Sequence, residues 1–390
     1  MRNPLSDKIV NIPPSGIRKF FDIVSEMKDA ISLGVGEPDF ETPWHIREEG
    51  IYSLEKGRTF YTSNAGLKPL KVEICEYLKR RCDVAYDPDR EVLVSVGGSE
   101  AIDLAMRAML NDGDEVLVPQ PSYVSYMPCV TLADGVPVVI QLEEKDQFRL
   151  TPEKLLEKIT DKTKILVLPF PNNPTGAIME REDLEKIVEI VLEKDLFVVS
   201  DEIYSELTYG DEPHVTIASF PGMKERTVLI NGFSKAYAMT GWRLGYAAAS
   251  AAILEQMLKI HQYAIMCAPT TSQYAAVSAL KNGDPDVAMM RESYNQRRRF
   301  LLHAFAEMGI ECFEPKGAFY TFPNIKRFGM TSEEFATRLL QEEKVAVVPG
   351  TAFGDCGEGF VRISYAYSLK NLKEALSRIE RFINRLDGKA

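Results

Sequence analysis

The sequence predicts an α/β protein with a mainly parallel central sheet, and three observations carry this prediction. Seven short apolar runs lie between residues 91 and 249, most of them continuous in Val, Ile and Leu. Continuous runs suit strands that are buried on both faces of a parallel sheet. Helical patterns lie between these runs. The residues that follow the runs are small, polar or ionisable, which is typical of a binding site at the carboxyl ends of parallel strands.

The seven expected strands form one large domain. They are residues 91–96, 114–119, 136–142, 164–170, 196–201, 227–232 and 243–249. Residues 99–110 and 181–194 have helical patterns, and Ser99 is a plausible N-cap of the first. We therefore expect residues 46–280 to form a three-layer α/β/α domain with a seven-stranded sheet.

A second, smaller domain is expected after the run "KNGDPD" (281–286), which interrupts the helical pattern. A long helix, four strand-like pieces and a last helix follow it. The strand-like pieces are residues 309–315, 317–323, 344–350 and 359–366. This pattern predicts an α+β domain over 281–390. Residues 1–45 have few regular signals and are expected to pack against that domain as an N-terminal arm.

Composition argues against several classes of function. The net charge of −11 opposes general nucleic-acid binding. The one basic cluster, "NQRRRF" (295–300), is interpreted as a solvated helix face. No signal peptide and no apolar run of membrane length is evident, so we expect a cytoplasmic protein without membrane contact. The six cysteines and four histidines lack the spacing of metal ligands, and no metal is expected.

Two ionisable side chains at strand ends point to chemistry. Lys235 follows a strand among small neighbours, and a partly desolvated lysine is a nucleophile because its neutral amine is favoured. Such an amine forms Schiff bases with carbonyl compounds. Asp201 ends another strand, where a buried carboxylate needs a cationic or hydrogen-bonding partner. Taken alone, each stretch favours a more ordinary explanation: a surface lysine in a loop for Lys235, and a helix N-cap or strand-end turn for Asp201.

Two further strand ends offer groups that bind anions and amides. The run "GGSEA" (97–101) opens a helix directly after a strand, and free N–H groups at a helix N-terminus bind phosphate. Arg243 is a candidate second phosphate ligand. The stiff turn "PNNPTG" (171–176) presents the amide of Asn173. Neither a phosphate-binding loop of nucleoside-triphosphate enzymes nor a dinucleotide fingerprint is present.

Taken together, these pieces resemble a family. The chain is similar to fold type I pyridoxal-phosphate enzymes, and within them to class I aminotransferases of the prokaryotic gamma type. The resemblance rests on "SLGVGEPDF" (32–40), the Y-x-x-x-x-G run from Tyr61, "GGSEA", "PSYVSY" (121–126), "PNNPTG", "SDEIY" (200–204), "NGFSKAYAMTGWRLGY" (231–246), "PKGAFY" (315–320) and "VRISYA" (361–366). These motifs span nearly the whole chain.

The resemblance implies roles for matching positions. Lys235 would form the Schiff base with pyridoxal 5′-phosphate, Asp201 would pair with its pyridine nitrogen, and Tyr123 would stack on its ring. Many relatives have tryptophan at that stacking position, and some have serine where this chain has Gly232. Further implied cofactor ligands are Gly98, Ser99, Glu100 through its backbone, Asn173, Tyr204, Ser234 and Arg243.

Substrate and partner contacts are implied in the same way. Arg362 would hold the substrate α-carboxylate, with Gly36 and Asn173 beside it. Ile17, in the arm segment "SGIRKFFD" (15–22), could cover the site as an apolar lid, and Arg18 is the nearby cation that argues for an acidic substrate. Tyr61 would reach the phosphate of the other subunit, which implies a homodimer with shared active sites.

The expected activity is transfer of an amino group from an amino acid to a 2-oxo acid, with 2-oxoglutarate as the expected acceptor, by a ping-pong mechanism. Aromatic or apolar donors are favoured, because a buried distal carboxylate would need a cation. Three alternatives remain open: an aspartate aminotransferase, a β-lyase or ring-forming synthase on the same fold, and a non-catalytic regulator. We expect no room for a DNA-binding segment before residue 32, and the acidic charge also disfavours the regulator.

Overall fold

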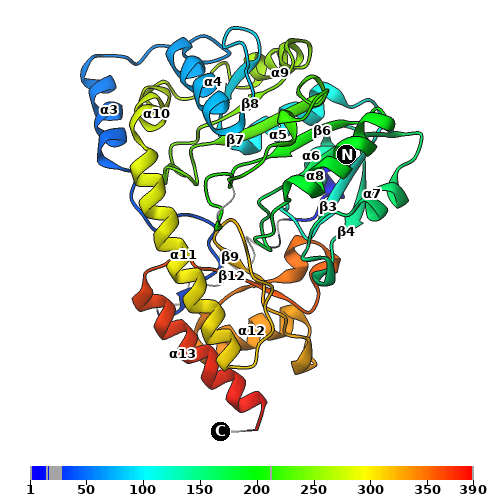
Figure 1. Ribbon diagram of the computed structural model, residues 1–390, viewed down its shortest axis with the longest axis vertical. Helices are drawn as coiled ribbons and strands as arrows, with labels where there is room; N and C mark the ends of the chain where they lie inside the picture. The colour runs from blue at the N-terminus through cyan, green and yellow to red at the C-terminus, as the bar shows by residue number, and fades with distance from the viewer. Residues whose placement is uncertain (1, 15, 17–28, 211–212, 389–390) are drawn as a thin grey trace.

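The fold is built around one large sheet with a smaller set of strands and helices beside it (Figure 1). The structure is a computed structural model, and it describes residues 2–14, 16, 29–210 and 213–388. The expected arm residue Ile17 and its neighbour Arg18 lie outside the described residues. Among the described helices, none is both long and apolar enough to cross a membrane.

The large sheet has seven strands, as the sequence predicts, and its order is β2-β8-β7-β6-β5-β3-β4. β8 runs antiparallel to both of its neighbours, and the other pairs are parallel. The strands are β2 (Val92–Ser95), β3 (Glu115–Gln120), β4 (Val136–Gln141), β5 (Thr163–Leu168), β6 (Phe197–Asp201), β7 (Thr227–Gly232) and β8 (Gly245–Ala248).

Helices cover both faces of this sheet, and they bury every residue of β7 and every residue of β6 except Phe197. On β6, Val198 packs with the α8 side and Val199 with the α5 side, so successive residues enter different cores. This burial on both faces explains the continuous apolar runs. The helices of this part are α3 (Trp44–Glu55), α4 (Lys68–Cys82), α5 (Gly97–Met109), α6 (Tyr126–Leu132), α7 (Pro152–Lys158), α8 (Arg181–Glu193), α9 (Ala251–Ala264) and α10 (Thr270–Asn282).

The start of α5 differs from the expectation that Ser99 caps it. The helix begins at Gly97, and the N-cap residue is Val96, so Ser99 lies within the first turn. Gly97 has a positive φ of 76°, which glycine adopts without strain and which lets the chain turn sharply from β2 into the helix. The early start places the backbone N–H groups of residues 97–99 at the end of the sheet.

The smaller part follows α10 and contains α11 (Asp284–Glu307), α12 (Ser332–Glu343) and α13 (Leu369–Leu386). Its three-stranded sheet has the order β11-β12-β9. β1 of the N-terminal segment pairs in parallel with β10. The strands are β1 (Ile31–Ser32), β9 (Tyr320–Thr321), β10 (Val345–Ala346), β11 (Val348–Pro349) and β12 (Val361–Ser364).

Short elements connect these parts. The first helix, α1 (Asp7–Val10), lies near α6. The 3-10 helices are η1 (Glu144–Asp146), η2 (Ile217–Ser219), η3 (Lys224–Arg226), η4 (Lys326–Phe328), η5 (Gly350–Phe353) and η6 (Asp355–Gly357). Residues 309–315 do not form the strand expected from their sequence. Only an isolated bridge joins Cys312 to Pro323, and proline donates no hydrogen bond to a ladder.

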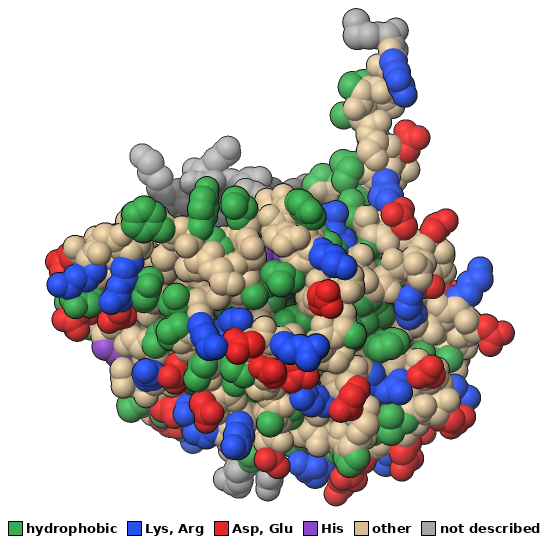
Figure 2. All heavy atoms as spheres, turned by 90° about the horizontal axis from the view of Figure 1, so that it is seen from above, with side chains coloured by type: hydrophobic (Ala, Val, Ile, Leu, Met, Phe, Trp, Pro, Cys, Tyr) green, Lys and Arg blue, Asp and Glu red, His purple; other side chains and the backbone are tan. Residues whose placement is uncertain are grey.

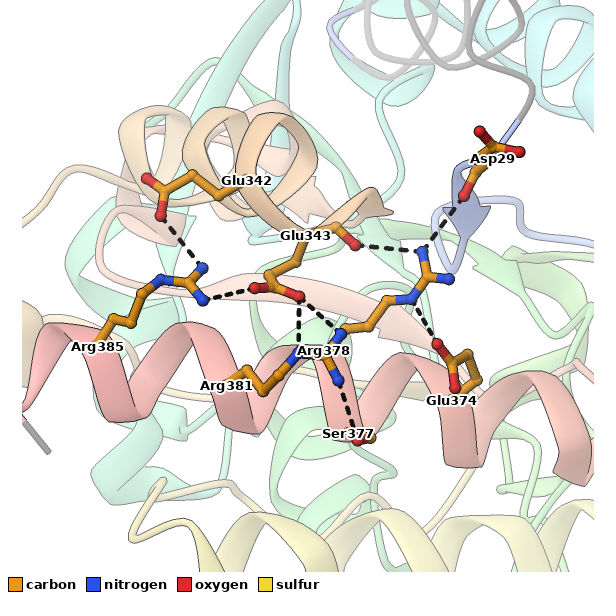
Figure 3. A network of polar contacts seen from close by, with 8 residues as sticks. All are labelled: Asp29, Glu342, Glu343, Glu374, Ser377, Arg378, Arg381 and Arg385. Atoms are coloured by element: carbon orange, nitrogen blue, oxygen red, sulfur yellow. Dashed lines mark hydrogen bonds and ion pairs between the residues drawn. The ribbon is translucent and has the colours of Figure 1, made fainter. Parts of the chain in front are cut away.

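A network of ion pairs fastens α13 to α12 and to the N-terminal segment (Figure 3). The buried carboxylate of Glu343 receives Arg381 at 2.9 Å and Arg385 at 2.7 Å. Arg378 donates to the backbone oxygens of Glu343 and Asp29, each at 3.3 Å. The network therefore holds the start of β1 against the smaller part, beside the β1–β10 pairing.

The basic cluster in α11 is not the solvated face that its sequence suggested. Arg297 and Arg298 are 7% and 8% exposed. Arg297 pairs with Asp39 at 2.7 Å, and Arg298 pairs with Glu314 at 2.7 Å. Arg299 is the exposed member, with 61% of its side chain in solvent. Two of the three arginines thus bind acidic residues of other segments, because they lie on the face of α11 that is buried.

Candidate active site

The sequence motifs converge on one cavity of about 350 Å³ at the carboxyl ends of the parallel strands. Both parts of the fold and the N-terminal segment contribute to its walls. The predicted site residues that line it are Gly36, Gly98, Ser99, Tyr123, Asn173, Asp201, Tyr204, Ser234, Lys235, Arg243 and Arg362. The structure therefore brings together groups that are more than 300 residues apart in the sequence.

Of the predicted site residues that the structure describes, two do not line this cavity. The side chain of Glu100 turns back to the backbone N–H of Val96 and contacts Nδ1 of His261 at 2.7 Å. The role predicted for Glu100 used only its backbone, and that role stays a prediction. Tyr61 is 78% exposed on a loop before α4, away from the cavity of its own chain.

Lys235 is a partly buried amine with a backbone partner. It follows β7, and its Nζ donates a hydrogen bond to the backbone oxygen of Gly36 at 2.6 Å. The amine lies 5.9 Å from the ring centre of Tyr204. Burial lowers the pKa of Lys235 to about 8, and the nearby carboxylate of Glu37 opposes the shift. At a pKa of about 8, roughly a tenth of this amine is neutral at pH 7, and the neutral form is able to act as a nucleophile or base.

Asp201 is a buried carboxylate at the end of β6. One oxygen accepts a hydrogen bond from the Tyr126 hydroxyl at 2.7 Å, and the other accepts from the backbone N–H of Ile203 at 3.2 Å. Burial raises the pKa of Asp201, whereas these two hydrogen bonds lower it. Among described residues, no lysine, arginine or histidine forms an ion pair with Asp201. The carboxylate is thus held ready for a cationic partner.

The neighbouring Glu202 points away from the cavity, as expected. It is 1% exposed, and it accepts hydrogen bonds from Ser200 at 2.8 Å and from Thr216. Its other oxygen contacts Nε2 of His214 at 2.9 Å. The two consecutive acids therefore have different surroundings, because successive residues leaving β6 face opposite sides of the sheet.

An anion-binding corner lies at the N-terminus of α5. A Cβ added at Gly97 would lie 2.7 Å from Nη2 of Arg243, so the guanidinium rests against the first turn of the helix. Arg243 itself has a positive φ of 52° and donates to the Thr240 backbone oxygen at 3.0 Å. The Ser99 hydroxyl lies 3.4 Å from that of Tyr123. Helix N–H groups with an adjacent arginine form a phosphate site.

Arg362 is a buried cation without an acidic partner. It lies in β12 and is 2% exposed. Its Nη1 donates to the Asn173 side-chain oxygen at 2.8 Å, and its Nη2 donates to the backbone oxygen of Gly34. Its Nε is buried without a partner, and no described carboxylate forms an ion pair with it. A buried guanidinium of this kind is suited to a carboxylate ligand.

These groups fit pyridoxal phosphate and an amino acid together. Lys235 supplies the amine that condenses with an aldehyde, and Asp201 supplies a partner for a protonated ring nitrogen. The α5 N-terminus and Arg243 fit the phosphate, and the unpaired Arg362 fits a substrate carboxylate. The described residues contain no cluster of metal ligands. Fold and cavity thus define a fold type I enzyme that uses pyridoxal phosphate.

Comparison with known proteins narrows this class. The model of the family "Aminotransferase class I and II" matches residues 28–379. The chain is 48% identical to an aspartate aminotransferase of Pyrococcus abyssi, over 97% of this chain and 98% of that one. It is 43% identical to aromatic-amino-acid aminotransferase 2 of Thermococcus litoralis, with the same coverage.

A solved structure gives the same result. The aromatic aminotransferase of Pyrococcus horikoshii superposes with a TM-score of 0.91 at 46% identity, covering 94% of this chain and 99% of that one. The chain belongs to the class I and II aminotransferases. It is a pyridoxal-phosphate-dependent aminotransferase.

Among the cavity residues that received no role from the sequence are two buried tyrosines. The Tyr126 hydroxyl donates a hydrogen bond to Asp201. The Tyr320 hydroxyl is hydrogen-bonded to that of Tyr204, and the Tyr320 ring stacks against the guanidinium of Arg362. Both stand in motifs that the sequence singled out, "PSYVSY" and "PKGAFY", but neither received a role. The sequence signal that could have identified them is a tyrosine within a run of residues that are expected to be buried. A buried hydroxyl requires a hydrogen-bonding partner, so such a tyrosine marks a polar neighbour.

Proposed function

We propose that this enzyme transfers the amino group of aromatic or other apolar amino acids to 2-oxoglutarate, with Lys235, Asp201 and Arg362 as the central groups. The observation that carries the proposal is that one cavity holds both the buried guanidinium of Arg362 and the partly buried amine of Lys235. Arg362 has no described acidic partner, and the amine of Lys235 lies near enough for Arg362 to lower its pKa. An α-amino acid offers a carboxylate to the first and a reacting Cα to the second.

The cofactor supplies an aldehyde that condenses with amines and a ring that withdraws electrons. Arg362 binds the substrate carboxylate in a bidentate manner and so fixes the orientation of Cα. The neutral Nζ of Lys235 would take the proton from the substrate Cα and deliver it to C4′, the carbon of the cofactor's aldehyde group. Asp201 stays ionised and pairs with a protonated ring nitrogen. The first product leaves before the 2-oxo acid binds, which is a ping-pong sequence.

The proposed preference for apolar donors rests on the charges of the cavity. Its described ionisable groups, tyrosines aside, are Glu37, Asp201, Lys235, Arg243 and Arg362. All three cations already have a proposed task. Lys235 reacts, Arg243 binds the phosphate, and Arg362 binds the α-carboxylate. The remaining acid is Glu37, which accepts a hydrogen bond from Thr240 at 3.2 Å. A distal carboxylate would therefore meet an acid rather than a free cation among the described residues.

The test is kcat/KM for phenylalanine, tyrosine, alanine and aspartate at a fixed concentration of 2-oxoglutarate. We expect phenylalanine and tyrosine to exceed aspartate, with neighbouring apolar substrates differing by about 10- to 200-fold. An aspartate value more than about tenfold above that of phenylalanine contradicts the proposed preference. The 48% identity to an aspartate aminotransferase makes aspartate the second candidate donor.

The variant Lys235→Ala tests the proposed role of the lysine directly. Lys235→Ala should abolish transamination. Borohydride should fix the cofactor covalently to the wild type and not to this variant. If the wild type releases pyruvate from cystathionine and does not transaminate amino acids, the β-lyase alternative is favoured instead. Normal transamination by Lys235→Ala would overturn the assignment of the lysine.

The functional unit is proposed to be a homodimer in which Tyr61 completes the phosphate site of the second copy. Large apolar side chains are exposed on neighbouring elements: Trp44, Ile51, Tyr52, Leu54, Phe60, Tyr61, Tyr263, Ile265 and Met266. The loop with Phe60 bonds to Thr270, and Asn64 bonds to Met266, so these residues form one face. Figure 2 looks down on the end of the molecule that holds α3, α4 and α9, where apolar side chains are visible between charged ones.

Subunit mixing tests this arrangement. Tyr61→Phe and Lys235→Ala impair different chains of one shared site. In a heterodimer of the two, one site combines both defects and the other has neither. Mixing the two inactive variants should therefore restore part of the activity. A monomer that is fully active during sedimentation would contradict the proposal.

A further inference from the structure

Tyr320 occupies a central place in the cavity that no role assigned above explains. It belongs to β9, pairs across the small sheet with Ser364 of β12, and is 1% exposed. Its side chain lines the cavity at the point where the smaller part meets the large sheet. It therefore connects residues from both parts of the fold.

Three contacts define its position. The Tyr320 hydroxyl lies 2.8 Å from the hydroxyl of Tyr204, and the guanidinium carbon of Arg362 lies 4.4 Å from the centre of the Tyr320 ring. A Cβ added at Gly36 would lie 2.5 Å from the Tyr320 hydroxyl oxygen, so only glycine leaves room for this hydroxyl. The backbone oxygen of that same glycine accepts the hydrogen bond from Lys235.

Each contact acts on a group with a different task. The ring of Tyr320 holds one face of the Arg362 guanidinium by a cation–π contact, while Phe353 lies 4.8 Å from the same group. The hydroxyl can donate to the oxygen of Tyr204, which leaves the Tyr204 proton free for a further acceptor. A hydroxyl that accepts one hydrogen bond donates a stronger one, because the bonds polarise each other.

We propose that Tyr320 is a positioning residue that orients Arg362 for the substrate carboxylate and strengthens Tyr204 as a hydrogen-bond donor to the cofactor ring oxygen. This inference rests on the proposed function and names a residue that serves both of its binding steps. The ring and the hydroxyl have separable tasks. One variant can therefore remove the hydroxyl alone, and a second can remove the ring as well.

The experiment uses the holoenzyme and the variants Tyr320→Phe and Tyr320→Leu. The first keeps the ring and removes the hydroxyl, and the second removes both. Tyr365→Phe is the matched control. Tyr365 is also fully buried in the smaller part, but its hydroxyl donates to the Ala318 backbone oxygen at 3.1 Å and does not line the cavity. It reports the structural effect of losing one buried hydroxyl.

The first readout is the pH titration of the absorbance of the bound cofactor. In Tyr320→Phe the midpoint should move to higher pH by about 0.3 to 1 unit, because a weaker donor stabilises the anionic ring oxygen less. Tyr365→Phe should leave the midpoint unchanged. The second readout is the Kd of 3-phenylpropionate, a carboxylate without an amino group. It should rise by about 3- to 30-fold in Tyr320→Leu and by less than twofold in Tyr320→Phe.

The inference is supported only if both shifts occur. It is overturned if Tyr320→Phe titrates like Tyr365→Phe, or if Tyr320→Leu binds 3-phenylpropionate as tightly as the wild type. Failure of the proposed function has a different signature. In that case the wild type itself would prefer aspartate to phenylalanine by more than about tenfold or would transaminate neither, whatever the variants do.

Discussion

Replacing Tyr126 by phenylalanine removes the hydroxyl that holds Asp201 without changing the shape of the side chain. In the structure this hydroxyl donates at 2.7 Å, and only the Ile203 N–H at 3.2 Å remains to the carboxylate. A hydrogen bond to a charged group contributes about 1.5–3 kcal/mol. At 1.36 kcal/mol per factor of ten, kcat/KM should fall by about 10- to 160-fold if that energy supports the ionised carboxylate during the reaction.

The pH profile gives the sign of the effect. Burial already raises the pKa of Asp201, and the Tyr126 hydrogen bond opposes that shift. Its loss raises the pKa further, so the ionised form disappears at a higher pH as the solution is acidified. The acidic limb of kcat/KM should move to higher pH, and the affinity for pyridoxal phosphate should fall with it.

Tyr77→Phe is the matched control for this experiment. Tyr77 donates to the buried carboxylate of Glu206, also at 2.7 Å, but neither residue lines the cavity. Both variants should unfold at a lower temperature than the wild type, and only Tyr126→Phe should lose activity. If Tyr126→Phe retains kcat/KM within twofold of the wild type across the pH range, Tyr126 does not support Asp201 in the reaction.

Three further predictions follow from single groups. Because the pKa of Lys235 is lowered to about 8, the rate at which cofactor-free protein recaptures pyridoxal phosphate should rise through that pH, and a flat profile from pH 6.5 to about 9 would contradict it. Glu343→Gln should lower the unfolding temperature by about 2–4 °C, whereas Glu374→Gln, at an exposed pair on α13, should have little effect. Arg362→Lys should raise KM for every amino donor by at least about tenfold, since a point charge cannot replace the bidentate fork, and equal KM values would refute this.

The large sheet was predictable because burial on both faces leaves a strong signal. Most strands between Val92 and Ala248 read as continuous apolar segments, and the structure confirms all seven expected strands. The expected strand at 309–315 shows the limit of that signal. Its sequence pattern resembles that of a strand, but the segment pairs with a neighbouring segment only through the isolated bridge at Cys312.

The site was partly predictable for a related reason. Lys235, Asp201 and Arg362 stand out because a charge among apolar residues needs an explanation. Arg297 and Arg298 were misjudged because a run of arginines looks solvated until Asp39 and Glu314 are brought to it by other segments. Tyr126 and Tyr320 were missed because a tyrosine in a core reads as packing, and its partner is known only in three dimensions. Ile17 lies outside the described residues, so its predicted covering role stays untested.

The long helix α11 can also be considered as a lever. Its 24 residues span about 36 Å, and it begins directly after Gly283, which separates it from α10. A rotation of about 5° at that joint would displace Arg297, about 20 Å along the helix, by about 2 Å. Arg297 grips Asp39, three residues after the glycine whose backbone oxygen accepts the hydrogen bond from Lys235. A small rotation at Gly283, remote from the cavity, would thus shift the backbone oxygen of Gly36 and change the orientation of the Lys235 amine.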